Sequence, residues 1–227
     1  SLITYTGTGA AGTIAHGLGA VPTMIIVKNR DVNDAWAVYH GKNDASPATK
    51  YLSLSAKDGL NAHITVWNNT IPSDSVFTIG SADSVNADGE KLIAYVFADV
   101  EGYSKMGSYI TNAANSGPFV YTGFKPAFVM VKVIGGSSNA SYWSWTIYDN
   151  KRVPFNRNHT PLFANLAVIE NFRGDGSTTS GGNTLYFDFL SNGFKVMNGG
   201  TEANGTAGTV VIYMAFAEQP TKYANAK

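Results

Sequence analysis

The stretch "HGLGAVPTMIIVK", residues 16–28, decides the fold, because a similar stretch, "YTGFKPAFVMVK", occupies residues 121–132. Both contain a glycine, a proline three residues later, an apolar run and a lysine. A short apolar run that follows glycine and proline is typical of a β-strand covered on both faces. The recurrence therefore predicts that the chain contains the same β unit twice.

The similarity between the two halves extends beyond these stretches. Residues 4–28 align with residues 108–132 without a gap, which places His16 opposite Val120. Later blocks align through aromatic residues, and the insertions between blocks are rich in Gly, Ser and Asn, as loops are. The aligned aromatic pairs are Trp36 with Trp145, Phe77 with Phe194, and Phe97 with Phe216.

These blocks predict the domain organisation and the fold class. We expect one β repeat over residues 1–105, a second over 106–220, and a polar tail over 221–227, with the two repeats packed together as one unit. The segments "YLSLS" and "LYFDFL" alternate apolar and polar residues, and no segment has a helical period over several turns. The fold class is therefore all-β, a jelly-roll-like β-sandwich built from two tandem homologous repeats. We expect its repeated core to include Trp36, Trp145, Phe97 and Phe216.

The composition excludes several kinds of partner. Sixteen basic residues balance sixteen acidic ones in the 227-residue chain, so no overall field attracts nucleic acid. No stretch has the length and apolarity of a membrane span, and we expect no membrane insertion. The chain contains no cysteine, which excludes disulfides and thiolate metal sites.

The sequence contains no motif that specifies chemistry. The four histidines lack metal-ligand spacing, and neither a G-x-S-x-G elbow nor a phosphate-binding loop is present. We therefore predict no catalytic, cofactor-binding or metal-binding residue, and no enzymatic activity. Two possibilities stay open: a calcium ion at "DVND" or "NADGE", and a carbohydrate-active β-sandwich enzyme with a pair of carboxylates that are distant in sequence.

One segment stands out as a candidate contact site for a partner or receptor. The stretch "YDNKRVPFNRNH", residues 148–159, is the most polar, basic and aromatic part of the chain. Lys151, Arg152 and Arg157 flank Phe155, a combination that suits a glycan or an anion. The alternative is an exposed loop between strands with no binding role.

The order of these sequence blocks along the chain resembles that of a known family. The series "IAHGLGAVPTMIIVK", "WAVYH", "SVFTIG", "LIAYVFADVEGYSKMGSY", "YTGFKPAFVMVK", "DFLSNGFKVMN" and "VVIYMAFAEQP" is similar to an uncharacterised duplicated β domain of tailed-phage virion proteins, of marine or cyanophage type. That domain is associated with tails or fibres.

The resemblance implies a non-enzymatic structural protein of the bacteriophage virion, assembled in the host cytoplasm. It implies a tail or fibre module for assembly and host attachment, whose partners are other virion proteins and a possible host-surface glycan. A homo-oligomer is expected, with a trimer favoured. A capsid-surface decoration (cement) protein is the alternative within the same class.

A pair of substitutions tests the strand assignment. Ile26 lies in the apolar run, so Ile26→Asp should bury a charge and prevent folding. Asn139 lies in an expected loop, so Asn139→Asp should be tolerated. Soluble expression of the two variants measures the difference, and equal tolerance would contradict a strand at residues 24–28.

Overall fold

The computed structural model describes residues 1–135, 144–168, 186–197 and 203–219, and it divides into two compact units. Unit 1 is Ser1–Asp99 and unit 2 is Val100–Lys227, so the division falls six residues before the predicted end of the first repeat at residue 105. Both units consist of antiparallel sheets, and the predicted all-β sandwich class is confirmed. The polar tail over residues 221–227 and Asn139 lie outside the described residues.

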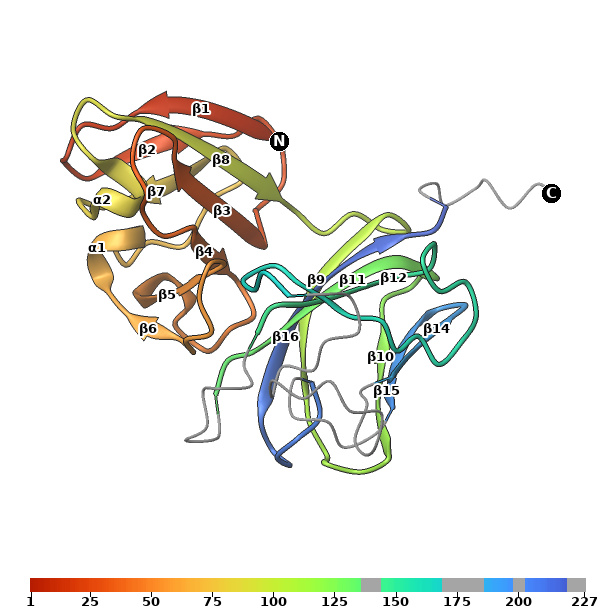
Figure 1. Ribbon diagram of the computed structural model, residues 1–227. Helices are drawn as coiled ribbons and strands as arrows, with labels where there is room; N and C mark the ends of the chain where they lie inside the picture. The colour runs from red at the N-terminus through yellow and green to blue at the C-terminus, as the bar shows by residue number, and fades with distance from the viewer. Residues whose placement is uncertain (136–143, 169–185, 198–202, 220–227) are drawn as a thin grey trace. The chain divides into compact units, whose positions relative to one another are not determined.

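Unit 1 contains a main sheet, a small sheet and three single helical turns (Figure 1). The main sheet has, in spatial order, β1 (Leu2–Thr6), β8 (Lys91–Phe97), β3 (Met24–Asn29), β4 (Ala37–His40), β5 (Lys50–Ser53) and β6 (Asn61–Ala62). The small sheet pairs β2 (Gly12–Ala15) with β7 (Val76–Ile79). The helical turns are η1 (Pro47–Thr49), α1 (Ile64–Trp67) and α2 (Asp83–Asn86).

The core of unit 1 lies between the main sheet and a layer made by the small sheet and both α-helical turns. Alternate residues of β3, β4 and β8 enter this core because side chains alternate across a strand. Trp67 of α1 contacts the ring of Tyr39 edge-on, with the ring centroids 5.8 Å apart. The buried members of the cluster are Ile25, Val27, Ala37, Tyr39, Ala48, Val66, Trp67, Phe77, Ile79, Val85, Leu92, Ala94 and Val96.

Unit 2 has a five-stranded main sheet and a three-stranded small sheet among its described residues. The main sheet has, in spatial order, β13 (Leu162–Phe163), β12 (Thr146–Asp149), β11 (Pro126–Val133), β16 (Val210–Ala217) and β9 (Ser104–Ile110). The small sheet has the order β10 (Ser116–Tyr121), β15 (Gly193–Met197) and β14 (Tyr186–Leu190).

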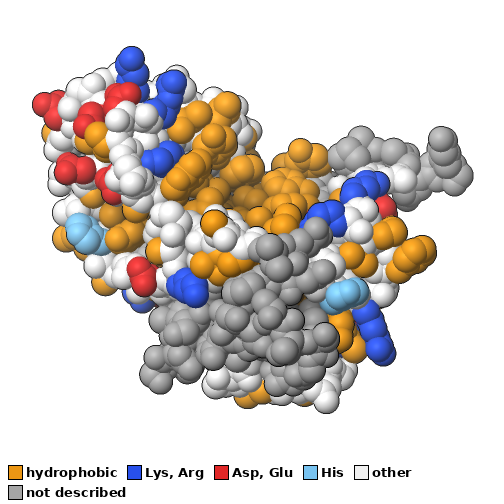
Figure 2. Space-filling view, in the orientation of Figure 1, with side chains coloured by type: hydrophobic (Ala, Val, Ile, Leu, Met, Phe, Trp, Pro, Cys, Tyr) orange, Lys and Arg blue, Asp and Glu red, His pale blue; other side chains and the backbone are white. Residues whose placement is uncertain are grey.

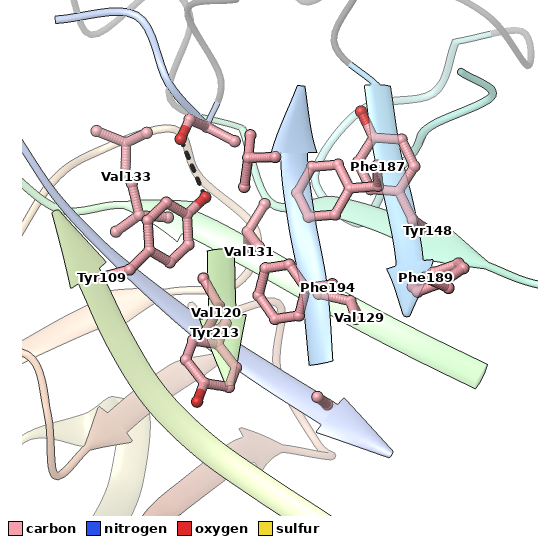
Figure 3. Packing of buried hydrophobic residues seen from close by; sticks show 14 of the residues in the cluster. Tyr109, Val120, Val129, Val131, Val133, Tyr148, Phe187, Phe189, Phe194 and Tyr213 are labelled. Carbon is pink, nitrogen blue, oxygen red and sulfur yellow. Dashed lines mark hydrogen bonds between the residues drawn. The ribbon is translucent and has the colours of Figure 1, made fainter. Parts of the chain in front are cut away.

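Aromatic rings fill the core between the two sheets of unit 2 (Figure 3). Phe194 of β15 stacks on Phe187 of β14 with their centroids 5.5 Å apart, and Phe187 stacks on Tyr148 at 4.2 Å. Phe194 also contacts Tyr213 and Tyr109 of the main sheet edge-on. Such pairs are favourable beyond the apolar area that they bury, by about 1 kcal/mol each.

The main sheets of the two units have the same strand order and the same pairing register. The order β1, β8, β3, β4, β5 in unit 1 corresponds to β9, β16, β11, β12, β13 in unit 2. Met24 pairs with Phe97 in unit 1. At the corresponding place in unit 2, Phe128 pairs with Phe216. The pair β2 and β7 likewise corresponds to β10 and β15. Descent of both units from one duplicated sequence stays a prediction, and this shared register supports it.

A buried asparagine ties the first loop of unit 1 to the segment before its last strand. Asn86 is fully buried, and its Oδ1 accepts the N–H of Thr8 at 2.8 Å. Its Nδ2 donates to the carbonyls of Ala10 and Gly80, both at 2.7 Å. The hydroxyl of Tyr5 donates to the carbonyl of the neighbouring residue Val85 at 2.7 Å, and burial raises the pKa of Tyr5. The hydroxyl therefore stays protonated as a donor.

Unit 2 contains the same arrangement with equivalent residues. The Oδ1 of fully buried Asn204 accepts the N–H of Asn112 at 2.9 Å, and its Nδ2 donates to the carbonyl of Ala114 at 2.9 Å. Tyr109 donates to the carbonyl of Ala203 at 3.0 Å, the dashed line in Figure 3, and burial raises its pKa. A Cβ on Gly117 would lie 2.7 Å from Asn204 Nδ2, so only glycine fits beside this amide.

The structure corrects one predicted equivalence, that of His16 with Val120. Val120 pairs with Phe194 as Ile14 pairs with Phe77, so Val120 corresponds to Ile14. His16 therefore corresponds to Thr122. Both side chains are buried and both accept a backbone N–H two residues later, through His16 Nδ1 at 3.2 Å and Thr122 Oγ1 at 3.4 Å. The gapless alignment failed because the turn before the proline is two residues longer in unit 1.

The predicted repeated core is only partly right. Trp145 is 2% exposed, but Trp36, Phe97 and Phe216 are half-buried. Residues of β8 alternate in burial, and the buried neighbours of Phe97 enter the sandwich core, which leaves Phe97 on the opposite face of the sheet. Ile26 is also on that face and is 8% exposed, so its burial agrees with the expected effect of Ile26→Asp.

The buried asparagine side chains predict a large loss of stability when either is replaced by alanine. Asn86→Ala and Asn204→Ala should each lower the free energy of unfolding by about 1–3 kcal/mol, because buried N–H and C=O groups lose their partners. Urea-induced unfolding measures the change. Asn33→Ala, at an exposed position, is the control and should leave the midpoint unchanged. Equal midpoints for all three variants would contradict the role of the buried amides.

Candidate functional site

The structure places three of the four predicted contact residues at the surface. Lys151, Phe155 and Arg157 are exposed, and Phe155 has the most exposed large apolar side chain among the described residues, at 80%. They lie in the loop of residues 150–160, which follows β12. Arg152 is half-buried and has a different role.

Arg152 holds the beginning of this loop against the end of β12. Its Nε donates to Asp149 Oδ2 at 2.5 Å, and Asp149 Oδ1 accepts the backbone N–H groups of Lys151 and Arg152, both at 2.9 Å. The equivalent residue in unit 1, His40, accepts the N–H of Lys42 through Nδ1. A turn-stabilising acceptor at this position is therefore common to both units, and Arg152 takes part in the scaffold.

The same contacts set the charge state of Asp149. Burial by itself raises the pKa of this carboxyl group, but the hydrogen bonds from Arg152 and Lys151, together with the positive charge of Arg152, outweigh burial. The net result is a pKa below the ordinary value, so Asp149 is ionised wherever the protein is folded near neutral pH.

The far end of the loop attaches to β14 through an isolated β-bridge. Asn158 and Phe187 exchange two backbone hydrogen bonds, each of 3.0 Å. The Oδ1 of Asn156 accepts the N–H of Phe189 at 3.0 Å, and the Nδ2 of Asn158 donates back to the carbonyl of Asp149 at 2.6 Å. These bonds fix the position from which Phe155 projects.

The loop therefore extends the outer face of the small sheet of unit 2. Across this face, Phe119 of β10 lies opposite Lys195 of β15, and Lys195 lies opposite Asp188 of β14. Arg157 lies next to Asp188, because its backbone N–H donates to Asp188 Oδ1 at 2.8 Å. The result is a row of one aromatic ring, one cation, one anion and a second cation.

Further aromatic groups border this row. Tyr121 follows Phe119 on the same face of β10, and these side chains are 65% and 48% exposed. On the other side of the row, the ring of His159 contacts the ring of Tyr186 edge-on, with centroids 6.2 Å apart. Orange, blue and pale blue side chains adjoin one another over the region of β14 in Figure 2. We call this surface the aromatic–basic face. Its residues are Phe119, Tyr121, Phe155, Arg157, His159, Tyr186, Asp188 and Lys195.

Two glycines let the aromatic rings of this face lie against the backbone. A Cβ on Gly193 would lie 3.1 Å from the Phe119 ring and 2.1 Å from the carbonyl oxygen of Val120. A Cβ on Gly123 would lie within 4 Å of the Tyr121 ring. The rings of Phe119 and Tyr121 therefore cover glycine positions.

The sequence alone identified the loop but not the strands of this face. Phe119, Tyr121, Asp188 and Lys195 lie within alternating strands and look like ordinary scaffold positions. They are found when the two units are compared in the register of the structure, in which Thr13 and Ala15 correspond to Phe119 and Tyr121.

The described residues offer little for other kinds of site. Within them, no three His, Cys, Asp or Glu side chains lie close enough together to hold a metal ion. The described helices are single turns, and none could cross a membrane.

The fold and this surface define a two-unit antiparallel β protein with an exposed aromatic–basic face. The chain belongs to a family described as a domain of unknown function, DUF7483, whose model matches residues 1–220. No curated protein and no solved structure matches the chain.

The ionised state of Asp149 predicts a pH-dependent effect of one substitution. Because its folded-state pKa is lowered, Asp149 contributes stability above the pKa of the unfolded chain, near 3.8, and loses that contribution as the pH falls through the lowered value. Asp149→Asn should therefore lower the urea midpoint at about pH 7 and have less effect at about pH 3. Asp74→Asn, at an exposed position, is the control. An equal effect of Asp149→Asn at both pH values would contradict the assigned role.

Proposed function

We propose that the chain is a non-enzymatic contact module of a tailed-phage virion, associated with the tail or a fibre, and that the aromatic–basic face of unit 2 makes the contact with the host surface. The observation that carries the contact role is the exposure of Phe119 and Tyr121 at scaffold positions that do not need aromatic residues. The similarity of the sequence blocks to virion proteins supports the particle assignment.

The comparison between the units separates scaffold from contact residues. The positions in unit 1 that correspond to Phe119, Tyr121, Gly193 and Lys195 are occupied by Thr13, Ala15, Val76 and Thr78. A sheet of the same register thus forms without aromatic rings or a cation on its outer face. Because exposed rings contribute little to folding, and exposed apolar patches mark interaction sites, their presence in unit 2 favours a binding role.

The small sheet of unit 2 also differs in its extent. Unit 1 places α1 next to β7, where the N–H of Gly80 donates to the carbonyl of Val66. Unit 2 adds β14 beside β15 and the loop of residues 150–160 beside β14, which widens the outer face. Loops and added strands on a fixed scaffold are the usual places for partner contacts.

The proposal includes assembly with other virion proteins and with copies of the same chain, as a trimer. The strands β1 and β9 lie at the edges of their main sheets, and each carries an exposed apolar residue, Leu2 at 63% and Ile110 at 56%. Edge strands with exposed apolar side chains are suited to pairing with another chain.

The particle assignment is tested by mass spectrometry of purified virions. In particles of a phage whose genome encodes this chain, peptides from both units should be present at a constant ratio to the major tail proteins after density-gradient purification. Their absence from purified particles, combined with their presence in the lysate of infected cells, would contradict the proposed function.

A further inference from the structure

We propose that the aromatic–basic face binds an acidic polysaccharide, with successive sugar rings stacked on Phe119 and Tyr121 and the sugar carboxylates paired with Lys195 and Arg157. This inference rests on the proposed contact role of the face and adds the chemical class of the ligand. All its residues belong to unit 2.

The two aromatic rings have the position and spacing that a sugar chain requires. Because they lie over Gly193 and Gly123, each ring is close to the backbone on one side and open on the other. Residues two apart on a strand are about 6.6 Å apart, so the two rings can contact different sugar units of one chain. A sugar ring has a face of C–H groups that packs on an aromatic ring while its hydroxyls point outward.

The charged groups favour an anionic sugar. Lys195 lies directly opposite Phe119 in the sheet, so the backbones of the two residues are one strand spacing, about 5 Å, apart. Its Nζ donates to Ser116 Oγ at 2.9 Å and has further donors for a ligand. Asp188, the anion of the row, accepts the N–H of Arg157, whose exposed guanidinium group can bind a carboxylate through two parallel hydrogen bonds.

Two other kinds of occupant fit less well. Single-stranded nucleic acid stacks on aromatic rings, but its binding needs a series of cations along the phosphates, and here Asp188 interrupts the row. Self-pairing of the face in a two-fold dimer would bring two surfaces of net positive charge together, because Lys195 and Arg157 outnumber Asp188. The carboxylates of an acidic sugar have the charge opposite to the net charge of the face, in which two cations accompany one anion.

Binding of the 227-residue chain to polygalacturonate, with dextran as the neutral comparison, tests the inference by isothermal titration calorimetry. The wild-type chain should bind polygalacturonate more tightly than dextran, and added salt should weaken the binding. Phe119→Thr and Tyr121→Ala install the corresponding residues of unit 1, so both variants should fold. Each should weaken binding roughly tenfold, because one stacking contact is lost.

Two further substitutions separate charge from ring stacking. Lys195→Thr, again the residue of unit 1, should weaken binding to polygalacturonate and reduce its dependence on salt. Phe119→Tyr keeps an aromatic ring at this position and should keep the affinity. Binding that is retained in Phe119→Tyr and weakened in Phe119→Thr would assign the loss to the ring. Ile71→Ala is the matched control, because it removes an exposed apolar side chain, 62% exposed, from unit 1 and should change nothing.

Several results would overturn the inference. They are no binding of polygalacturonate by the wild-type chain, equal affinity for dextran, unchanged affinity in Phe119→Thr and Tyr121→Ala, or tighter binding of a single-stranded oligonucleotide. A change of sedimentation coefficient in these two variants without a change in polysaccharide binding would assign the face to self-association. A chain that is present in purified virions but does not bind polygalacturonate would leave the proposed function intact and contradict only the ligand class.

Discussion

Each unit depends on one buried amide side chain that satisfies backbone groups from two distant segments. In unit 1 this is Asn86, and in unit 2 it is Asn204. The loop between the first two strands must cross from the main sheet to the small sheet, and its backbone polar groups leave the sheet ladder there. An unsatisfied buried N–H or C=O costs more than an ordinary hydrogen bond gains, so the position of this loop follows from the amide. With no cysteine in the chain, disulfides do not contribute to this closure.

The outer face of the small sheet is under no such constraint, and there the two units differ. The inner residues Phe77 and Phe194 occupy the same register position and fill the core of their units. Their neighbours on the outer face, Thr78 and Lys195, differ in both size and charge. One unit therefore serves as a reference for the other, since whatever both retain is explained by folding. What only unit 2 has requires a different explanation, and contact with a ligand supplies it.

The sequence was most informative where a physical rule acts on a short segment. The apolar runs of β3 and β11 and the alternation in β14 predicted strands, because side-chain direction has a fixed period along a strand. The alignment failed at His16, because a histidine ring and a threonine hydroxyl can both accept the same backbone N–H although the residues look unrelated. It also overestimated the burial of Trp36, since an aromatic residue fits either face of a sheet.

The candidate site was predicted only in part, for a related reason. The loop residues Lys151, Phe155 and Arg157 are conspicuous in the sequence, because basic and aromatic residues cluster there. Phe119 and Lys195 are far apart in the chain and come together only through the pairing of β10 with β15. Long-range pairing depends on the whole fold, so no local pattern reveals it. Arg152, by contrast, looked like a contact residue and is engaged by Asp149.

The buried amide of unit 2 is also a site at which the chain can be damaged chemically when it unfolds. Asn204 is followed by Gly205, and an asparagine before glycine readily cyclises to a succinimide and loses its amide nitrogen when the backbone is free to move. Burial and hydrogen bonding hold Asn204 in place and suppress this reaction in the folded state. Each unfolding event exposes it, and the resulting carboxylate can no longer donate to the carbonyl of Ala114. Unit 2 is thus expected to age chemically through irreversible deamidation, whereas unit 1, in which Ala87 follows Asn86, is better protected.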